Sequence, residues 1–170
     1  MARSHPDAVD RIVQQWGEVR PRLDVAPIEV VGRVSRLSRL IDRRLGANFG
    51  EHGLQDWMYD VLATLRRGGA PYELTAGELV AQTMVTTGAM TNRIDRLTDL
   101  GYVERRQGSD RRTVIVALTD AGRAKVDEVS TSHLATERDL LRALSPKQRD
   151  QLAALLRTVL LSLDDTPATP

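Results

Sequence analysis

The stretch 86–118 constrains the fold most, because it is the one place in this 170-residue chain where a helical pattern gives way to strand-like segments. A helix is expected over about 86–99, and Gly101 closes it. The segments 102–106 and 113–118 are predicted to be two strands around a polar turn. The sequence therefore predicts a single β-hairpin in a chain that is otherwise helical.

Elsewhere, apolar residues recur at the spacing of amphipathic helices, and capping residues and helix breakers set the bounds. Thr75 and Glu78 form a capping-box pattern, Thr119 is placed to cap a long helix, and Ser145 to cap the last one. The helices expected outside 86–99 cover about 7–20, Pro27 to about 50, 54–67, a short segment after Thr75, Thr119 to about 144 and Ser145 to about 163.

Two short helices, a turn, a further helix and a β-hairpin form the order of a winged helix-turn-helix. The fold class expected is therefore mainly α, with one β-hairpin as the wing. We expect a single domain over 1–170, with the winged helix at 54–118 and disordered ends at 1–5 and 165–170.

Composition excludes several classes of function. Lys and Arg number 24 against 23 Asp and Glu, a net charge of +1, so any anion binding must be local. The chain has no cysteine, and its three histidines lack metal-ligand spacing, so we expect no metal and no cofactor. The sequence also shows no combination of a nucleophile and a base that would indicate an enzyme. No secretory or membrane-spanning pattern is evident, so a cytoplasmic protein without a membrane partner is expected.

The helix 86–99 has the two faces expected of a DNA-recognition helix. Met90, Ile94 and Leu97 define its buried side, and polar residues lie opposite. Thr and Asn side chains can donate or accept hydrogen bonds at bases and phosphates, and a glycine lets the backbone approach closely. The expected DNA contacts on this helix are Thr86, Thr87, Gly88, Thr91, Asn92 and Arg96.

The hairpin carries four arginines against two carboxylates, a local net charge of +2. Such a cluster taken alone is more often a solvated basic turn, but its position next to a helix pair favours contact with the DNA backbone or minor groove. The charged residues of the hairpin are Arg105, Arg106, Arg111 and Arg112, with Glu104 and Asp110.

Arg93 is out of place on this helix, because it falls on the flank that faces the protein. A partly buried guanidinium needs a partner, since an unpaired charge in an apolar setting is costly. Asp56, Asp60 and Arg67 share one face of the helix 54–67 and are the candidate neighbours. A structural ion pair and a ligand-binding charge both remain open at this point.

Three segments carry a family resemblance: Thr87 to Leu97, Leu100 to Arg106, and Asp110-Arg111-Arg112 followed by 118–123. They resemble the MarR family of transcriptional regulators, over nearly the whole chain. The resemblance implies a homodimer joined by its N- and C-terminal helices, at 7–50 and 120–163, that binds a pseudo-palindromic operator in double-stranded DNA. It also implies that Asp110 holds the wing while Arg111 or Arg112 enters the minor groove.

Residues 60–67 and 72–75, together with the N-terminal helix that carries Trp16, resemble the urate-responsive branch of this family. The resemblance implies that Trp16, Asp60, Arg93 and Arg105 form a pocket for a small anion. Trp16 also completes the apolar stripe of the first helix, and Arg105 is equally suited to a phosphate contact at the start of the wing.

We therefore expect a sequence-specific DNA-binding transcriptional regulator, a homodimeric repressor released from DNA by a urate-like anion or a small carboxylate. The alternative is a helical, dimeric protein-interaction module without a ligand response.

Overall fold

The computed structural model describes residues 5–83, 85–108, 110 and 113–165. Arg111 and Arg112 lie outside the described residues, as do 1–4 and 166–170, where disordered ends are expected. A first compact unit ends at Arg44 and a second begins at Leu45, so the single domain stays a prediction. Among the helices of the described ranges, none combines the length and apolar character that crossing a bilayer requires.

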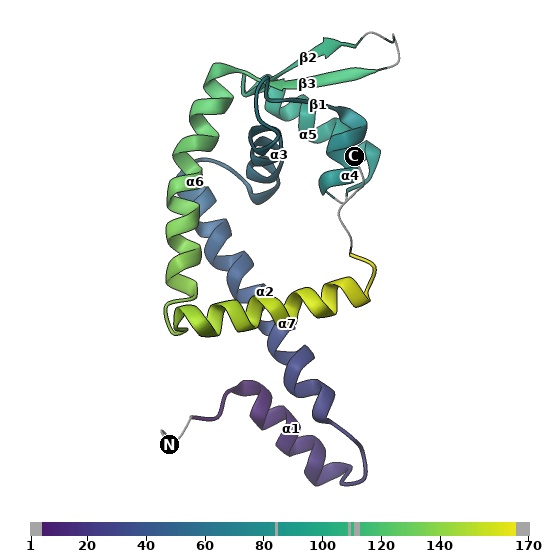
Figure 1. The fold of residues 1–170 in the computed structure, drawn as a ribbon, viewed down its shortest axis with the longest axis vertical. Coiled ribbons are helices and arrows are strands. Elements are labelled where there is room, and N and C mark those ends of the chain that lie inside the picture. Colours follow the sequence, from purple (N-terminus) through teal and green to yellow (C-terminus); the bar gives the residue numbers. More distant parts are fainter. Residues whose placement is uncertain (1–4, 84, 109, 111–112, 166–170) are drawn as a thin grey trace. The chain divides into compact units, whose positions relative to one another are not determined.

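The elements follow the order expected from the sequence, with one addition (Figure 1). In chain order they are α1 (Ala8–Val19), α2 (Ala26–Glu51), α3 (Asp56–Arg67), β1 (Glu73–Thr75), α4 (Ala76–Thr83), α5 (Thr87–Asp99), β2 (Val103–Gln107), β3 (Val114–Leu118), α6 (Asp120–Leu140) and α7 (Pro146–Ser162).

In the first unit, the first turn of α1 contacts α2. Asp7 caps α1, and Arg33 of α2 pairs with Asp7 at 2.8 Å and with Asp10 at 2.6 Å. Val9 is buried beside Gly32, where an added Cβ would lie 3.2 Å from Val9 Cγ1. Gly32 on α2 thus leaves room for the side chain of Val9 on α1, and Arg33 pairs with both carboxylates of the α1 capping box.

The second unit contains the predicted winged helix, and its fold class is confirmed. The hairpin of β2 and β3 lies within one residue of its expected bounds, but it is not the whole sheet. The strand β1 pairs antiparallel with β3, which gives the order β1-β3-β2. The expectation of a hairpin alone was wrong because a strand of three residues is too short to show alternation, and its partner is distant in sequence.

Two helix bounds also differ from the pattern. The helix α3 begins at Asp56 and not at Leu54, whose N–H instead donates to the carbonyl of Phe49 at the end of α2. The helix α6 ends at Leu140, short of the expected residue 144. Arg149 Nε donates to the carbonyls of Leu141 and Leu144, at 3.2 and 3.1 Å, and so supplies partners to a corner between α6 and α7.

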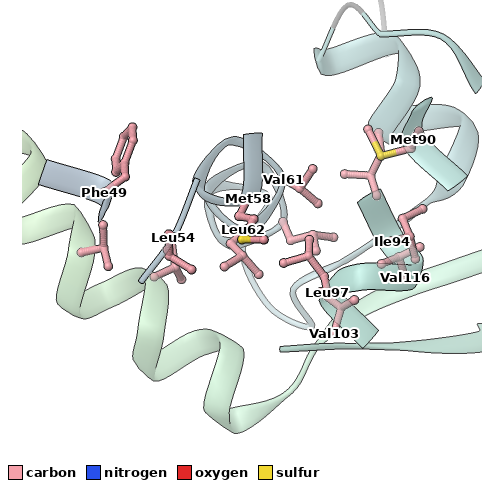
Figure 2. Close-up of a cluster of buried hydrophobic side chains, with 14 residues drawn as sticks. Phe49, Leu54, Met58, Val61, Leu62, Met90, Ile94, Leu97, Val103 and Val116 are labelled. Carbon is pink, nitrogen blue, oxygen red and sulfur yellow. The ribbon is translucent and has the colours of Figure 1, made fainter. Parts of the chain in front are cut away.

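The core of the second unit lies between α3, α5 and the sheet. Figure 2 shows Val61 and Leu62 of α3 between the end of α2 and the side chains of α5, and both are 0% exposed. The buried side predicted for α5 is confirmed, since Met90, Ile94 and Leu97 are all 2% exposed or less. The opposite face of α5 is therefore the one available to a partner.

Hydrogen bonds connect the turn after α5 to the start of α6. Gly101, with φ of 73°, follows the helix, and the amides of Gly101 and Tyr102 donate to the carbonyls of Thr98 and Leu97. Thr119 Oγ1 donates to the Gly101 carbonyl at 2.7 Å and accepts from the amide of Gly122 at 3.0 Å. A Cβ at Gly122 would lie 1.9 Å from the Tyr102 carbonyl oxygen, so this position needs glycine.

Candidate nucleic-acid interface and anion site

The polar face of α5 begins at its N-terminus, which is the end of a recognition helix that meets base edges. Thr86 caps the helix by accepting from the amide of Ala89 at 3.3 Å. The six residues expected to contact DNA are all exposed: Thr86, Thr87, Gly88, Thr91, Asn92 and Arg96. Thr91 Oγ1 donates to the Thr87 carbonyl at 3.0 Å, which leaves its oxygen able to accept a further hydrogen bond.

Arg105 connects the wing to the recognition helix. Its guanidinium pairs with the Asp95 carboxylate and donates from Nη2 to the Thr91 carbonyl at 3.4 Å. Thr91 and Asp95 are one turn apart on α5, whereas Arg93 is roughly 200° around the helix from Thr91. Within the described chain, Arg105 thus contacts a side of α5 that Arg93 does not occupy.

Arg106, a second expected DNA contact, is exposed but already paired. It lies 3.2 Å from Glu73 of β1 and also pairs with Glu104, its neighbour on β2. These carboxylates reduce the net positive charge of this edge of the sheet. Asp110 is exposed, and its role in holding the wing stays a prediction, as do the roles of Arg111 and Arg112.

Arg93 is half-buried, as its position on the helix wheel predicted, and its contact is an aromatic ring. The guanidinium carbon lies 5.7 Å from the ring centroid of Trp57 on α3, within the range of a cation–π interaction. Sequence reasoning missed Trp57. Its spacing of three residues from Asp60 places both on one side of α3 and was the available signal.

Asp60 is close enough to Arg93 to interact electrostatically, but the two are not ion-paired. No pair within 4.0 Å joins Arg93 to any acidic group among the residues that the structure describes, so the structural ion pair, one of the two alternatives left open by the sequence, is not observed there. Partial burial raises the pKa of Asp60 above its usual value, and the charges of Arg93 and Arg67 oppose that rise. The charge of Arg93 is therefore only partly balanced.

Trp16 belongs to the first unit, whereas Asp60, Arg93 and Arg105 belong to the second. Trp16 is 43% exposed as a residue, so it is available to a ligand or to another chain. The four-residue anion pocket stays a prediction. No group of three or more potential metal ligands lies together among the described residues.

Apolar stripes on α2 and α7 are largely uncovered in the single chain. Such exposure is uncommon for monomers and typical of surfaces that bind a partner. The exposed residues are Val30, Val31, Val34, Leu37 and Leu40 on α2, with Leu155, Leu156, Val159, Leu160 and Leu161 on α7.

Comparison with known sequences identifies relatives of this arrangement. The sequence profile of the MarR family matches residues 52–113, which span α3 to the end of the wing turn. The HTH-type transcriptional regulator PecS of Dickeya dadantii (strain 3937) is 43% identical over 152 residues, covering 89% of this chain and 92% of that protein.

Solved structures share the fold. A MarR variant from E. coli, crystallised with operator DNA, is 26% identical with a TM-score of 0.70, covering 85% of this chain and 97% of that one. AbsC, a MarR family transcriptional regulator from Streptomyces coelicolor, is 22% identical with a TM-score of 0.76, covering 85% of this chain and 99% of that one. The second likeness shows the fold alone.

Proposed function

The chain belongs to the MarR family of DNA-binding transcriptional regulators, and we propose that it is a homodimeric repressor that a small anion releases from its operator. The family consists of regulators and not enzymes, which confirms the expectation that the chain is not an enzyme. We expect it to act in the cytoplasm, in contact with the DNA that it binds.

The observation that carries this proposal is the exposed polar face of α5. Its threonines, Asn92 and Arg96 lie at and after the N-terminus of the helix, while the apolar face is buried in the core. Side chains so placed can reach base edges in the major groove. Arg106, Arg111 and Arg112 of the wing would then contact phosphates or the minor groove, with Asp110 holding the turn.

Dimerisation is supported by the uncovered apolar stripes of α2 and α7, which a second copy of the chain would bury. A symmetric dimer places two recognition helices in successive major grooves. We therefore expect protection of a pseudo-palindrome whose half-sites lie about 10 base pairs apart, centre to centre.

The ligand response is supported by Arg93, a cation on the recognition helix that interacts electrostatically with Asp60 but forms no ion pair within 4.0 Å among the described residues. An anion that binds Arg93 near Asp60 acts directly on α5, because the guanidinium belongs to that helix. Asp60 and Arg93 carry the proposed site in the second unit, and only the family resemblance adds Trp16 and Arg105 to it. Such a site suits urate or a small carboxylate.

The test is a gel-shift titration against the DNA upstream of the protein's own gene, with and without urate. Retarded DNA that urate releases, with a palindromic footprint, is the expected result. A protein that binds no specific DNA and remains dimeric would favour the interaction module, and a complex that no anion affects would contradict the ligand response.

A further inference from the structure

We propose that Glu73 and Glu104 compete with DNA phosphates for Arg106, and that this competition lowers the affinity of the protein for DNA. The inference rests on the proposed function, which assigns Arg106 to a phosphate or minor-groove contact, and it adds an intramolecular competitor for that cation. Nothing in the sequence pattern pointed to Glu73, which lies 33 residues before Arg106 in the chain.

Arg106 and its two partners lie on the same face of the sheet. In the register of the strands, Glu73 of β1 and Glu104 of β2 are both opposite Ala117 of β3. Residues directly opposite each other point to the same face, and so do residues two apart on one strand. Arg106 therefore shares the face of Glu104, whereas its neighbour Arg105 points to the other face and contacts α5.

The guanidinium of Arg106 joins the two outer strands of the sheet. Its Nη1 donates to the Glu73 carboxylate on β1 at 3.2 Å, and its Nη2 donates to the Glu104 carboxylate on β2. The strand β3 lies between them, and its residue at this level is Ala117, whose small side chain leaves room for an arginine to cross. The charge of Arg106 is thus shared between two carboxylates.

The two carboxylates also direct the guanidinium towards the base of the wing. Arg106 is opposite Ile115, whereas both of its partners are opposite Ala117, two residues nearer to α6. The turn of the wing, which is proposed to meet the DNA, lies at the other end of the hairpin. To contact a phosphate near that turn, the guanidinium has to leave both carboxylates.

The pairs of Arg106 are exposed enough to be exchanged for DNA. The side chain of Arg106 is 56% exposed, that of Glu104 is 47% exposed and that of Glu73 is 29% exposed. Exposed ion pairs contribute little free energy, whereas a phosphate contact also releases counterions from the DNA. DNA can therefore displace the carboxylates, but its affinity is reduced by the free energy of the pairs that are lost.

The test measures how the affinity of the full-length protein for operator DNA changes when a competitor is removed. Glu73→Gln keeps the size of the side chain and removes its charge. We expect this variant to bind the operator about 2- to 20-fold more tightly than the wild type, since a dimer engages two wings. The gain should decrease as the salt concentration rises, because salt screens the ion pair that the wild type has to break.

Two controls separate this competition from a general loss of repulsion between the protein and DNA. Asp120→Asn removes the same charge from an exposed carboxylate that pairs with Arg123 of α6, and it should change the affinity less than Glu73→Gln does. Arg106→Gln should weaken DNA binding and lower the salt slope. In that background, Glu73→Gln should have no more effect than Asp120→Asn. Glu104→Gln should tighten binding as Glu73→Gln does, and it keeps the test decisive where Glu73→Gln does not fold.

Unchanged or weaker binding by both Glu73→Gln and Glu104→Gln would overturn the inference, because loss of a merely structural ion pair does not tighten DNA binding. An equal gain from Glu73→Gln in the wild type and in Arg106→Gln would also overturn it, since the gain would not depend on Arg106. Unchanged DNA binding by Arg106→Gln would show that this cation does not contact DNA, and the inference would fail.

The same titrations on random DNA distinguish these failures from a failure of the proposed function, because phosphate contacts do not depend on sequence. A wild type without preference for the operator would contradict the proposed regulator. Tighter binding of random DNA by Glu73→Gln, lost in the Arg106→Gln background, would still support the competition for Arg106.

Discussion

The Arg105 guanidinium of the wing pairs with the Asp95 carboxylate of the recognition helix. The same guanidinium donates to the Thr91 carbonyl, so β2 and α5 are joined at the middle of the helix. This contact gives Arg105 a structural task that differs from both roles expected of it, the anion pocket and a phosphate contact.

Asp95→Ala should therefore reproduce the effects of Arg105→Ala. A double-mutant cycle should give a coupling of about 0.2–1 kcal/mol in the free energy of unfolding, the range for an exposed ion pair. Gel shifts with urate distinguish this structural role of Arg105 from a role in binding the anion. If Arg105→Ala weakens release by urate and Asp95→Ala does not, Arg105 binds the anion and its pairing with α5 is secondary.

The close approach of Gly122 to Tyr102 predicts a large loss of stability in Gly122→Ala. An added Cβ would meet the Tyr102 carbonyl oxygen at 1.9 Å, and backbone cannot move aside as a flexible side chain can. We expect a loss of about 3 kcal/mol or more, at the upper end of overpacking effects. Gly77→Ala in α4 is the matched control, because its nearest neighbour is a side-chain oxygen at 3.9 Å. Urea denaturation of both variants checks the prediction, and equal midpoints would contradict it.

The sequence predicted the features that depend only on the residue pattern within a single helix or strand. The buried side of α5 followed from helical spacing, and the capping box of Thr75 and Glu78 is present, with the Thr75 amide donating to Glu78 at 2.7 Å. Contacts between elements were not predictable in this way. The pairing of Arg105 with Asp95 depends on how β2 lies against α5, and Trp57 meets Arg93 only because α3 packs on α5.

Because Arg33 contacts the first turn of α1, we expect its removal to destabilise this helix without affecting the winged helix. Arg33→Ala removes the partner of Asp7 and Asp10, so hydrogen exchange of the α1 amides should accelerate while the amides of α5 are unaffected. Arg36→Ala, which removes an exposed arginine one turn away, is the control. Uniform acceleration throughout the chain would contradict a local role for Arg33.

The division of DNA contacts into base-reading and phosphate-binding residues predicts different responses to salt. Arg112→Ala should weaken binding to operator and random DNA by similar factors and lower the salt slope by about one unit. Asn92→Ala should narrow the difference between operator and random DNA with little change in slope. Binding isotherms at several salt concentrations measure both effects, and indistinguishable variants would contradict the division.

The raised pKa of Asp60 predicts that its charge opposes folding. Because the folded-state pKa lies above the unfolded value near 3.8, the wild type loses stability as the pH rises through the folded-state pKa. The Asp60→Asn variant has no ionisable group at this position and therefore does not lose stability in this way as the pH rises. Its free energy of unfolding should exceed that of the wild type at pH 7, and the difference should disappear below the unfolded pKa.

Arg93 provides the internal control for Asp60, because its positive charge lowers the pKa of that carboxyl and so reduces the penalty. The gain from Asp60→Asn should therefore be larger in an Arg93→Ala background than in the wild type. Chemical denaturation of the four proteins between pH 7 and about pH 3, which lies below the unfolded value, measures the cycle. An equal gain in both backgrounds would mean that Arg93 and Asp60 do not interact, and Asp60 would then have no part in the response to an anion bound at Arg93.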